Sequence, residues 1–308
     1  AGASIVSILL DENTYNSESL LDTKMSPLQG PALIVRNNAT FTEADFASLA
    51  KIGQGSKLDK LDTTGRFGLG FNSTYHITDT PSFVSGDHVV IFDPHCNYVP
   101  GATNAQPGVR IRYTNTTLNT TFKNQFEPFC FFGCDVNTHY NGTLFRFPLR
   151  TPSQARKSEI SKRSYSIADV EANIDQLAHN LSNMLIFLRN VRCIEVYRCV
   201  QGSSVPVLLH KASSSVSGVE HVNDQILLSY FDRNKTNTSV SSGSSTGGDS
   251  GGGVMSRDGF YKRLMSTPDN VLPRVFSQVT INSEVYGEVN SSGGSNSSAG
   301  TNNSVVHS

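Results

Sequence analysis

Three closely spaced glycines open a helix-like segment in the stretch Gly65-Arg66-Phe67-Gly68-Leu69-Gly70-Phe71-Asn72-Ser73-Thr74-Tyr75-His76. Glycine lets the backbone approach a ligand closely, because it carries no Cβ. The free N–H groups of a first helical turn, together with the positive end of the helix dipole, suit a phosphate. The stretch therefore predicts a phosphate-binding turn that leads into a helix.

The residues around these glycines exclude two common phosphate-binding motifs. A dinucleotide fingerprint requires a strand directly before the glycines, whereas residues 54–64 are polar and charged. A Walker loop ends in Gly-Lys-Ser or Gly-Lys-Thr, which this stretch does not. Upstream, residues 31–35 form an apolar run, residues 37–41 a turn, and Thr42 with Asp45 the capping-box pattern of a helix start. The predicted order is strand, turn, helix, polar loop, Gly-x-Gly and helix.

This order resembles the ATPases of the gyrase, histidine-kinase, MutL and heat-shock chaperone superfamily, and most closely its repeated sacsin-type modules. The resemblance runs from residue 1 to about residue 199. It implies an α+β fold of the Bergerat type, a two-layer sandwich of a mixed or antiparallel sheet with helices on one face, plus a small C-terminal α/β appendage. The matching motifs are Gln29-Gly30-Pro31-Ala32-Leu33, residues 37–41, residues 65–79, Pro81-Ser82-Phe83-Val84-Ser85-Gly86, Phe92-Asp93-Pro94-His95, Asn124-Gln125-Phe126-Glu127-Pro128-Phe129, Phe132-Gly133-Cys134 and Tyr140-Asn141-Gly142-Thr143-Leu144-Phe145-Arg146.

The resemblance also implies a site for ATP, which is carried over only where residues match. The loop 52–64 occupies the place of the family's lid, where Lys57 could reach a phosphate as a point charge. Arg66 could meet a phosphate or pair with Asp59 or Asp62 of that loop. The matching positions are Asn37, Asn38, Ala39 and Phe41 on the adenine side, and Lys57, Arg66, Phe67, Gly68, Leu69, Gly70 and Phe71 on the phosphate side.

Two departures from the family pattern bear on this chemistry. Position 38 has asparagine where an aspartate is expected, and a neutral hydrogen bond to adenine is roughly half as strong as a charge-assisted one. Ala39 and Phe41 stand where other branches have glycines, and Phe41 either crowds or lines the pocket. The family's first helix, with a glutamate that activates water and an asparagine that holds Mg²⁺, ends in Asp-Asp-Ala-Gly-Ala-Ser, and this chain starts at Ala1-Gly2-Ala3-Ser4. We expect ATP binding without catalysis or a magnesium site here, unless an upstream helix supplies both groups.

The composition of the chain limits the kinds of partner and the cellular location that we expect. The chain has 308 residues, 37% of them hydrophobic, and a net charge of −1, which gives no electrostatic case for nucleic acid. No run reaches the roughly 18 apolar residues that span a membrane. Five cysteines, an odd number, favour a reducing compartment, so we expect a cytoplasmic protein. The partners that the resemblance implies are heat-shock chaperones or client proteins.

For the other reactive residues, a structural role is weighed against a metal-binding or catalytic one. A zinc site from His95, Cys96, Cys130 and Cys134 is conceivable, but paired cysteines at two-residue spacing are missing, so buried free thiols are favoured. Cys96 as a nucleophile has no support in the sequence. His76 is expected to be structural rather than a base. Asp79 and Asp93 are expected at a helix end and in a turn.

The remaining sequence predicts three regions. Residues 1–150 form the nucleotide-binding domain, with strands at 5–10, 31–35, 88–92, 109–113 and 143–149. Residues 151–235 contain an amphipathic helix over 167–188 and a strand at 194–200 that begins a second, smaller unit. Residues 236–308 are rich in Gly, Ser and Asn and should be flexible, with one strand at 275–286. The function expected is an ATP-binding co-chaperone module, and the alternative is a scaffold that keeps the fold but binds no nucleotide.

Overall fold

The structure, a computed structural model, describes residues 2–49, 69–188, 190–216, 279–286 and 300–304. Contacts divide the chain into two units, residues 1–213 with 282–303, and residues 214–281 with 304–308. The described residues of the second unit are the ends of strands β8 and β9 and Ser304. Both sites discussed below lie in the first unit.

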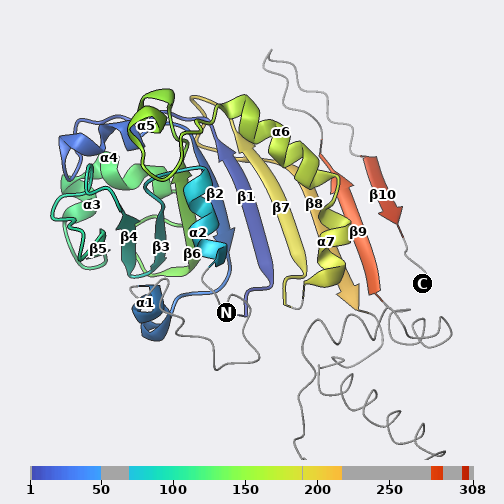
Figure 1. Ribbon diagram of the computed structural model, residues 1–308. Helices are drawn as coiled ribbons and strands as arrows, with labels where there is room; N and C mark the ends of the chain where they lie inside the picture. Colours follow the sequence, from blue (N-terminus) through green and yellow to red (C-terminus); the bar gives the residue numbers. More distant parts are fainter. Residues whose placement is uncertain (1, 50–68, 189, 217–278, 287–299, 305–308) are drawn as a thin grey trace, which may run out of the picture. The chain divides into compact units, whose positions relative to one another are not determined.

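The described strands form one mixed sheet with the order β10-β9-β8-β7-β1-β2-β6-β3-β4-β5 (Figure 1). β1 pairs in parallel with β7 and antiparallel with β2, and β6 joins β2 to the antiparallel run β3-β4-β5. The mixed sheet expected from the sequence is therefore confirmed. The strands are β1 (Ile5–Asp11), β2 (Ala32–Asn37), β3 (Ser82–Gly86), β4 (His88–Phe92), β5 (Gly108–Arg112), β6 (Tyr140–Pro148), β7 (Cys193–Cys199), β8 (Val207–Val216), β9 (Val279–Val285) and β10 (Gly300–Ser304).

The described helices are short, and most are shorter than the strands they connect. The predicted capping box is confirmed, because Thr42 N donates to Asp45 Oδ2 over 2.9 Å and Asp45 N donates to Thr42 Oγ1 over 3.3 Å. The helices are η1 (Thr23–Leu28), α1 (Glu43–Leu49), α2 (Leu69–Asn72), η2 (Ser73–His76), α3 (Leu118–Thr121), α4 (Lys123–Phe126), η3 (Glu127–Phe129), α5 (Pro152–Lys157), α6 (Ile167–Ala178) and α7 (Leu181–Phe187).

Helices cover both faces of the sheet. Neighbouring residues of a strand point to opposite faces, so Val84 of β3 lies in one core while Phe83 faces the other way. The Val84 core also contains Met25 of η1 and Phe126 of α4. On the Phe83 face, Figure 1 shows α2, α6 and α7 together. The expectation of helices on one face only is therefore incomplete.

Two elements differ from the sequence-based expectation. The helix expected over 167–188 is broken between α6 and α7, where Asn180 Nδ2 donates to Gln176 O and the His179 ring bonds Asp175 O. Such side chains compete for the last carbonyls of a helix and favour its end. The strand expected to begin a second unit is β7, which instead pairs with β1 in the main sheet.

Candidate functional site

The turn after β2 is held on the sheet by two buried hydroxyl groups. Asn37 Oδ1 accepts from Ala39 N over 3.0 Å, which makes a local side-chain turn. Thr143 Oγ1 donates to Ala39 O over 2.7 Å, and Ser85 Oγ accepts from Phe41 N over 2.9 Å. The Ser85 and Thr143 hydroxyl oxygens lie 2.9 Å apart, and both residues are fully buried. The turn is thus fixed by β3 and β6, which lie far from it in sequence.

Sequence analysis did not single out Ser85 or Thr143. Both belong to motifs that carry the family resemblance, and both are small hydroxyl residues at fully buried strand positions. A hydroxyl at an inward strand position requires a hydrogen-bond partner. This rule could have pointed to Ser85 and Thr143 in the sequence, although it does not say which loop supplies the hydrogen-bond partner.

Asn38 is directed at the start of β1. Its Oδ1 accepts from Ser4 N over 2.9 Å and from Ile5 N over 3.0 Å, and its Nδ2 donates to Ser4 Oγ over 2.9 Å. The carboxamide therefore joins β2 to the residues before β1. An adenine amine at this position would share an oxygen that two backbone N–H groups already use.

An array of phenylalanine rings brings the two halves of the predicted site onto one face of the sheet. Phe41, from the turn, lies 5.0 Å from Phe83 between ring centroids, and Phe83 lies 6.4 Å from Phe92. Phe71 of α2 lies 5.1 Å from Phe92. Phe46 of α1 stacks on Phe83 at 6.0 Å. Phe41 thus lines this face by packing against Phe83, and the turn and α2 share one aromatic floor.

The phosphate side of the predicted site is described only in part. Lys57, Arg66, Phe67 and Gly68 lie outside the described residues. Gly70 lies in α2 and is exposed, and a Cβ placed on it would meet no other element of the described chain within 4 Å. Packing therefore does not require glycine at position 70, which leaves a role in ligand approach open.

A buried arginine holds the far end of the glycine helix. Arg150 is 1% exposed, and its guanidinium donates to Asp79 Oδ1 over 2.7 Å, to Tyr75 O over 2.5 Å and to His76 O over 2.8 Å. Ser158 Oγ donates to the same Asp79 oxygen over 2.9 Å. Because Tyr75 and His76 lie in η2, which follows α2 directly, these bonds fix the end of the segment formed by α2 and η2. Asp79 lies at the expected helix end, but its role as a buried ion-pair partner was missed.

The other candidate reactive residues have structural partners. Asp93 Oδ2 accepts from Tyr98 N and Val99 N, which confirms the expected turn role. His95 Nε2 accepts from Glu159 N over 3.1 Å. Cys130 is exposed as a residue, but desolvation of its thiol, with Glu127 nearby, raises the pKa of that thiol to about 11, so it stays protonated at neutral pH. All five cysteines are outside disulfides.

Metal binding finds no support in the described part of the chain. No group of three or more His, Cys, Asp or Glu residues there is close enough to hold a metal ion. Since His95, Cys96, Cys130 and Cys134 are all described, they do not assemble the conceivable zinc site. None of the helices within the described ranges is long and apolar enough to span a bilayer.

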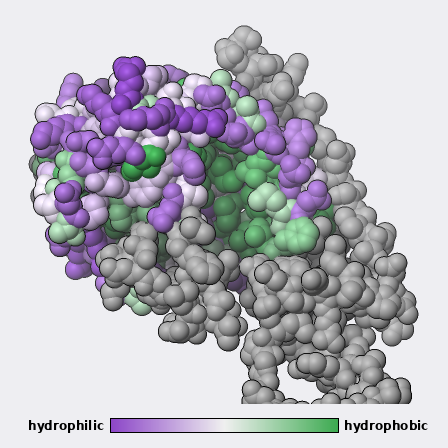
Figure 2. All heavy atoms as spheres, viewed as in Figure 1, coloured by the Kyte–Doolittle hydropathy of each residue, from purple (hydrophilic) through white to green (hydrophobic). Residues whose placement is uncertain are grey.

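An apolar hollow adjoins the aromatic face. Figure 2 shows hydrophobic surface where Figure 1 places β1 and β7, between α2 and α6. Ile8 and Val35, which are paired in register, alternate with the buried Leu9 and Ile34 and are partly exposed. On α7, the Phe187 side chain is 64% exposed. A large apolar side chain is thus exposed on α7 as well.

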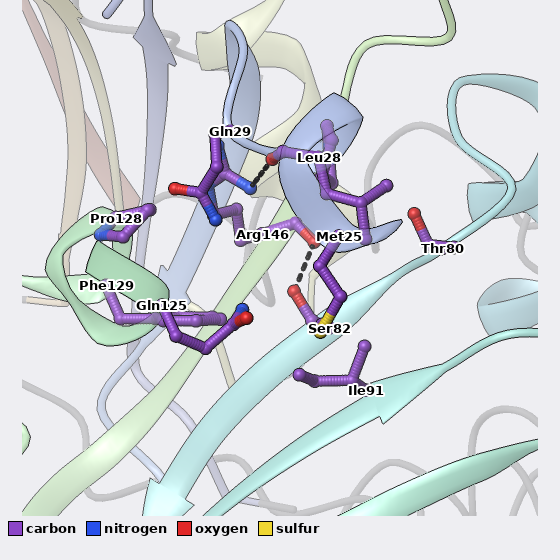
Figure 3. Close-up of a pocket in the computed structure, with 11 residues that line it drawn as sticks. Met25, Leu28, Gln29, Thr80, Ser82, Ile91, Gln125, Pro128, Phe129 and Arg146 are labelled. Carbon is purple, nitrogen blue, oxygen red and sulfur yellow. Dashed lines mark hydrogen bonds between the residues drawn. The ribbon is translucent and has the colours of Figure 1, made fainter. Parts of the chain in front are cut away.

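The opposite face contains a small polar cavity around Arg146 (Figure 3). Its volume is about 10 Å³, which is room for about one water molecule. The Arg146 guanidinium donates to Leu28 O over 2.7 Å and to Gly30 O over 2.8 Å. A cavity of this size admits no nucleotide.

Comparisons with known proteins confirm the resemblance to sacsin modules. The family model for the sacsin domain matches residues 1–211. Human sacsin is 35% identical over 221 residues, which cover 70% of this chain and 5% of sacsin, so the chain spans a small part of that relative. A solved structure described as the N-terminal domain of a DNA repair protein has 10% identity, covers 67% of this chain and 46% of that one, and has a TM-score of 0.30, too low to carry an argument. On the strength of the family match over most of its length, the chain belongs to the sacsin domain family.

Proposed function

We propose that this chain binds ATP on the aromatic face, between the turn 37–41 and the beginning of α2, in a Bergerat-type arrangement. The observation that carries the proposal is the phenylalanine array, which joins two segments separated by about 30 residues of sequence over one floor. These are the two segments in which the sequence predicts the adenine and phosphate contacts. Membership of the sacsin domain family supports the same assignment.

The proposed roles follow the chemistry of each side. Asn38 offers its amide oxygen to the adenine amine, beside Asn37, Ala39 and the ring of Phe41. Gly70, with Leu69 and Phe71, lets phosphates approach the backbone N–H groups of the helix start. Lys57, Arg66, Phe67 and Gly68 complete the phosphate side in the proposal, on the sequence alone. Magnesium finds no fitting donor set among the described residues, so no catalytic step is assigned to it.

The cellular role proposed from the family resemblance is co-chaperone work in protein quality control, in the cytoplasm. Heat-shock chaperones or their client proteins are the proposed partners. Since the chain spans 5% of human sacsin, the activity of that whole protein is not transferred to it. The apolar hollow beside the nucleotide face is a surface that such partners could contact.

A second candidate is a scaffold that binds no nucleotide. The specific observation in its favour is Asn38, because its carboxamide already makes three hydrogen bonds within the chain. In this reading the asparagine keeps the strands in register and the aromatic array is a core.

Isothermal titration with ATP, and with GTP as the base control, separates the two candidates. The ATP proposal expects saturable heat with ATP and at least tenfold weaker binding of GTP, since guanine presents a carbonyl where adenine presents its amine. Equal affinities would remove the adenine contact from the proposal. Absence of heat with either nucleotide at millimolar concentration would leave the scaffold.

A further inference from the structure

An open cleft lies beyond the carboxyl ends of the two parallel strands. Its volume is about 410 Å³, within the range of small-molecule and side-chain pockets. One wall follows β1 and another follows β7, and η3 with the residues after it provides the third. The lining residues are Asn13, Thr14, Tyr15, Asn16, Glu127, Cys130, Phe131, Gln201, Gly202, Ser203 and Ser204.

This cleft is separate from the proposed nucleotide site. The turn 37–41 adjoins the start of β1, where Val6 pairs with Asn37, whereas the cleft follows Asp11 at the strand's end. β1 has seven residues, so its ends lie about 20 Å apart at the usual rise of a strand. Binding in the cleft can therefore be tested independently of ATP.

Buried hydrogen bonds fix the walls of the cleft. The Asn13 side chain is 8% exposed, and its Nδ2 donates to Asp11 Oδ1 and to Ser203 O, both over 2.9 Å. Its Oδ1 accepts from Gly202 N over 2.8 Å, so one side chain joins the segments after β1 and β7. Tyr15 Oη donates to Asp11 Oδ2 over 2.8 Å, which fixes its ring. A cleft held in this way is preorganised, which lowers the entropic cost of binding.

The charges of the cleft favour a cation. Glu127 is the one formally charged side chain among the eleven lining residues, all of which are described. Cys130 stays neutral at pH 7, since desolvation and Glu127 raise its pKa to about 11. Behind the Tyr15 wall, Asp11 and Arg146 carry opposite charges and interact with each other. Because no lysine or arginine lines its walls, the cleft offers no positive charge to a phosphate or carboxylate.

We propose that this cleft binds a cationic group, the ammonium or guanidinium of a lysine or arginine side chain or of a free amine, with Glu127 as its counter-ion. The aromatic rings of Tyr15 and Phe131 contact the apolar stem, and a ring face also attracts a cation. The amide and hydroxyl groups of Gln201 and Ser204 on the rim can pair with the polar atoms around that stem.

Titration of the chain with capped lysine (N-acetyl-lysine amide), with capped norleucine and with spermidine tests the proposal. Norleucine has the same chain without the ammonium. We expect capped lysine to bind at least tenfold more tightly than capped norleucine, and increasingly weakly as salt rises. If spermidine binds and capped lysine does not, the site is assigned to free amines. Equal binding of norleucine, or no binding of any probe at 10 mM, would overturn the proposal.

Two variants tie the binding to this cleft. Glu127→Gln keeps an oxygen for Asn124, which donates to Glu127 Oε2 over 3.2 Å, but removes the charge, and should weaken binding at least tenfold. Glu159→Gln is the matched control, because Glu159 is exposed and does not line the cleft. Ser204→Lys places a cation at the exposed rim and should abolish binding even if Glu127→Gln fails to fold. Unchanged affinity in Ser204→Lys would exclude this cleft as the binding place.

Discussion

Asn38 connects the turn after β2 to the start of β1 at the place where we propose the adenine contact. Its carboxamide accepts from two backbone N–H groups and donates to the Ser4 hydroxyl. An aspartate at this position would keep the oxygen that accepts from both backbone N–H groups. The Ser4 hydroxyl could then donate to the second carboxylate oxygen. Asparagine in place of the family's aspartate therefore preserves these structural hydrogen bonds. It offers a neutral oxygen instead of a charged one to the proposed adenine amine.

We expect Asn38→Ala to lower the free energy of unfolding by about 1 kcal/mol, similar to the loss of a helix cap, because two N–H groups lose their acceptor. Asn38→Asp should stay within about 0.5 kcal/mol of the parent, as ordinary surface substitutions do. Urea unfolding of the three proteins measures both differences. An Asn38→Ala protein as stable as the parent would show that these bonds contribute nothing.

Arg150 is both buried and charged, so its stability in the fold depends on its ion-pair and hydrogen-bond partners. Arg150→Met would leave Asp79, 7% exposed, with Ser158 as its remaining side-chain donor. Removing one partner of a buried ion pair typically costs about 3–5 kcal/mol. We expect a loss of that size in urea unfolding, and a smaller one for Asp79→Asn, which keeps an oxygen for Arg150. A loss below about 1 kcal/mol in Arg150→Met would contradict this account.

At the scale of the element, β5 depends on a close backbone approach. A Cβ on Gly108 would lie 2.5 Å from Ile91 O and 3.2 Å from the Cα of Phe92. Both are backbone atoms of β4, the strand that pairs with β5, and β5 is the last strand of the sheet order. The strand therefore has no second neighbour within the sheet to hold it in place.

Gly108→Ala should consequently destabilise the chain by about 1–3 kcal/mol, as overpacking does. It should also speed amide hydrogen exchange in β4 and β5, since their ladder must shift. Gly30→Ala is the control, because nothing lies within 4 Å of a Cβ at that position. Equal stability of the two variants would mean that the β4–β5 edge relaxes without cost.

Local rules predicted the local elements. The Thr42 capping box needed only its own four residues, and short apolar runs placed β1 and β4 correctly. These local rules did not predict contacts between residues that lie far apart in the sequence. The parallel partner of β1 lies almost 190 residues away, and Arg150 meets Asp79 across 71 residues. The break at His179 and Asn180 was hidden because the apolar spacing of α6 and α7 continues across it.

The candidate site shows the same division. The glycines and the turn 37–41 were identified from motifs, whereas the phenylalanine array that joins them became visible only in the fold. Apolar residues are expected inside any core, so Phe71 and Phe92 carry no signal of a shared floor in sequence. The cleft around Glu127 was also missed, since its three walls come from distant segments.

At the scale of the molecule, a buried carboxyl couples stability to pH. Burial raises the pKa of Asp11 above 3.8, despite Arg146 nearby and the bonds from Tyr15 and Asn13. The folded state then holds the Asp11 proton more tightly than the unfolded state. This contribution to stability is therefore fully present below the unfolded pKa of 3.8, and it is lost as pH rises from there through the raised pKa of the folded state.

Comparing the parent with Asp11→Asn isolates this group. We expect the free energy of unfolding of the parent, relative to that of Asp11→Asn, to decrease as pH rises from about 4 to about 7. Urea midpoints measured at each pH give the difference. If the difference in free energy of unfolding between the two proteins stays constant, or grows in favour of the parent as pH rises, burial does not raise the pKa of Asp11.

The two proposed sites lie near opposite ends of β1. We propose an adenine nucleotide on the aromatic face beside the turn 37–41, and a cation in the cleft beyond Asp11. An ATP-binding module with a separate contact for lysine or arginine could hold a protein partner while the nucleotide exchanges.

The most direct test of the central claim is thermal unfolding with ATP for the parent, Gly70→Ala and Gly30→Ala. At 100 times its dissociation constant, ATP should stabilise the parent and Gly30→Ala by about 2.7 kcal/mol. Gly70→Ala should be at least as stable without nucleotide, since alanine favours a helix and the added methyl meets nothing within 4 Å. It should nevertheless lose most of the ATP effect. No stabilisation of the parent at millimolar ATP, or an undiminished effect in Gly70→Ala, would contradict nucleotide binding at this place.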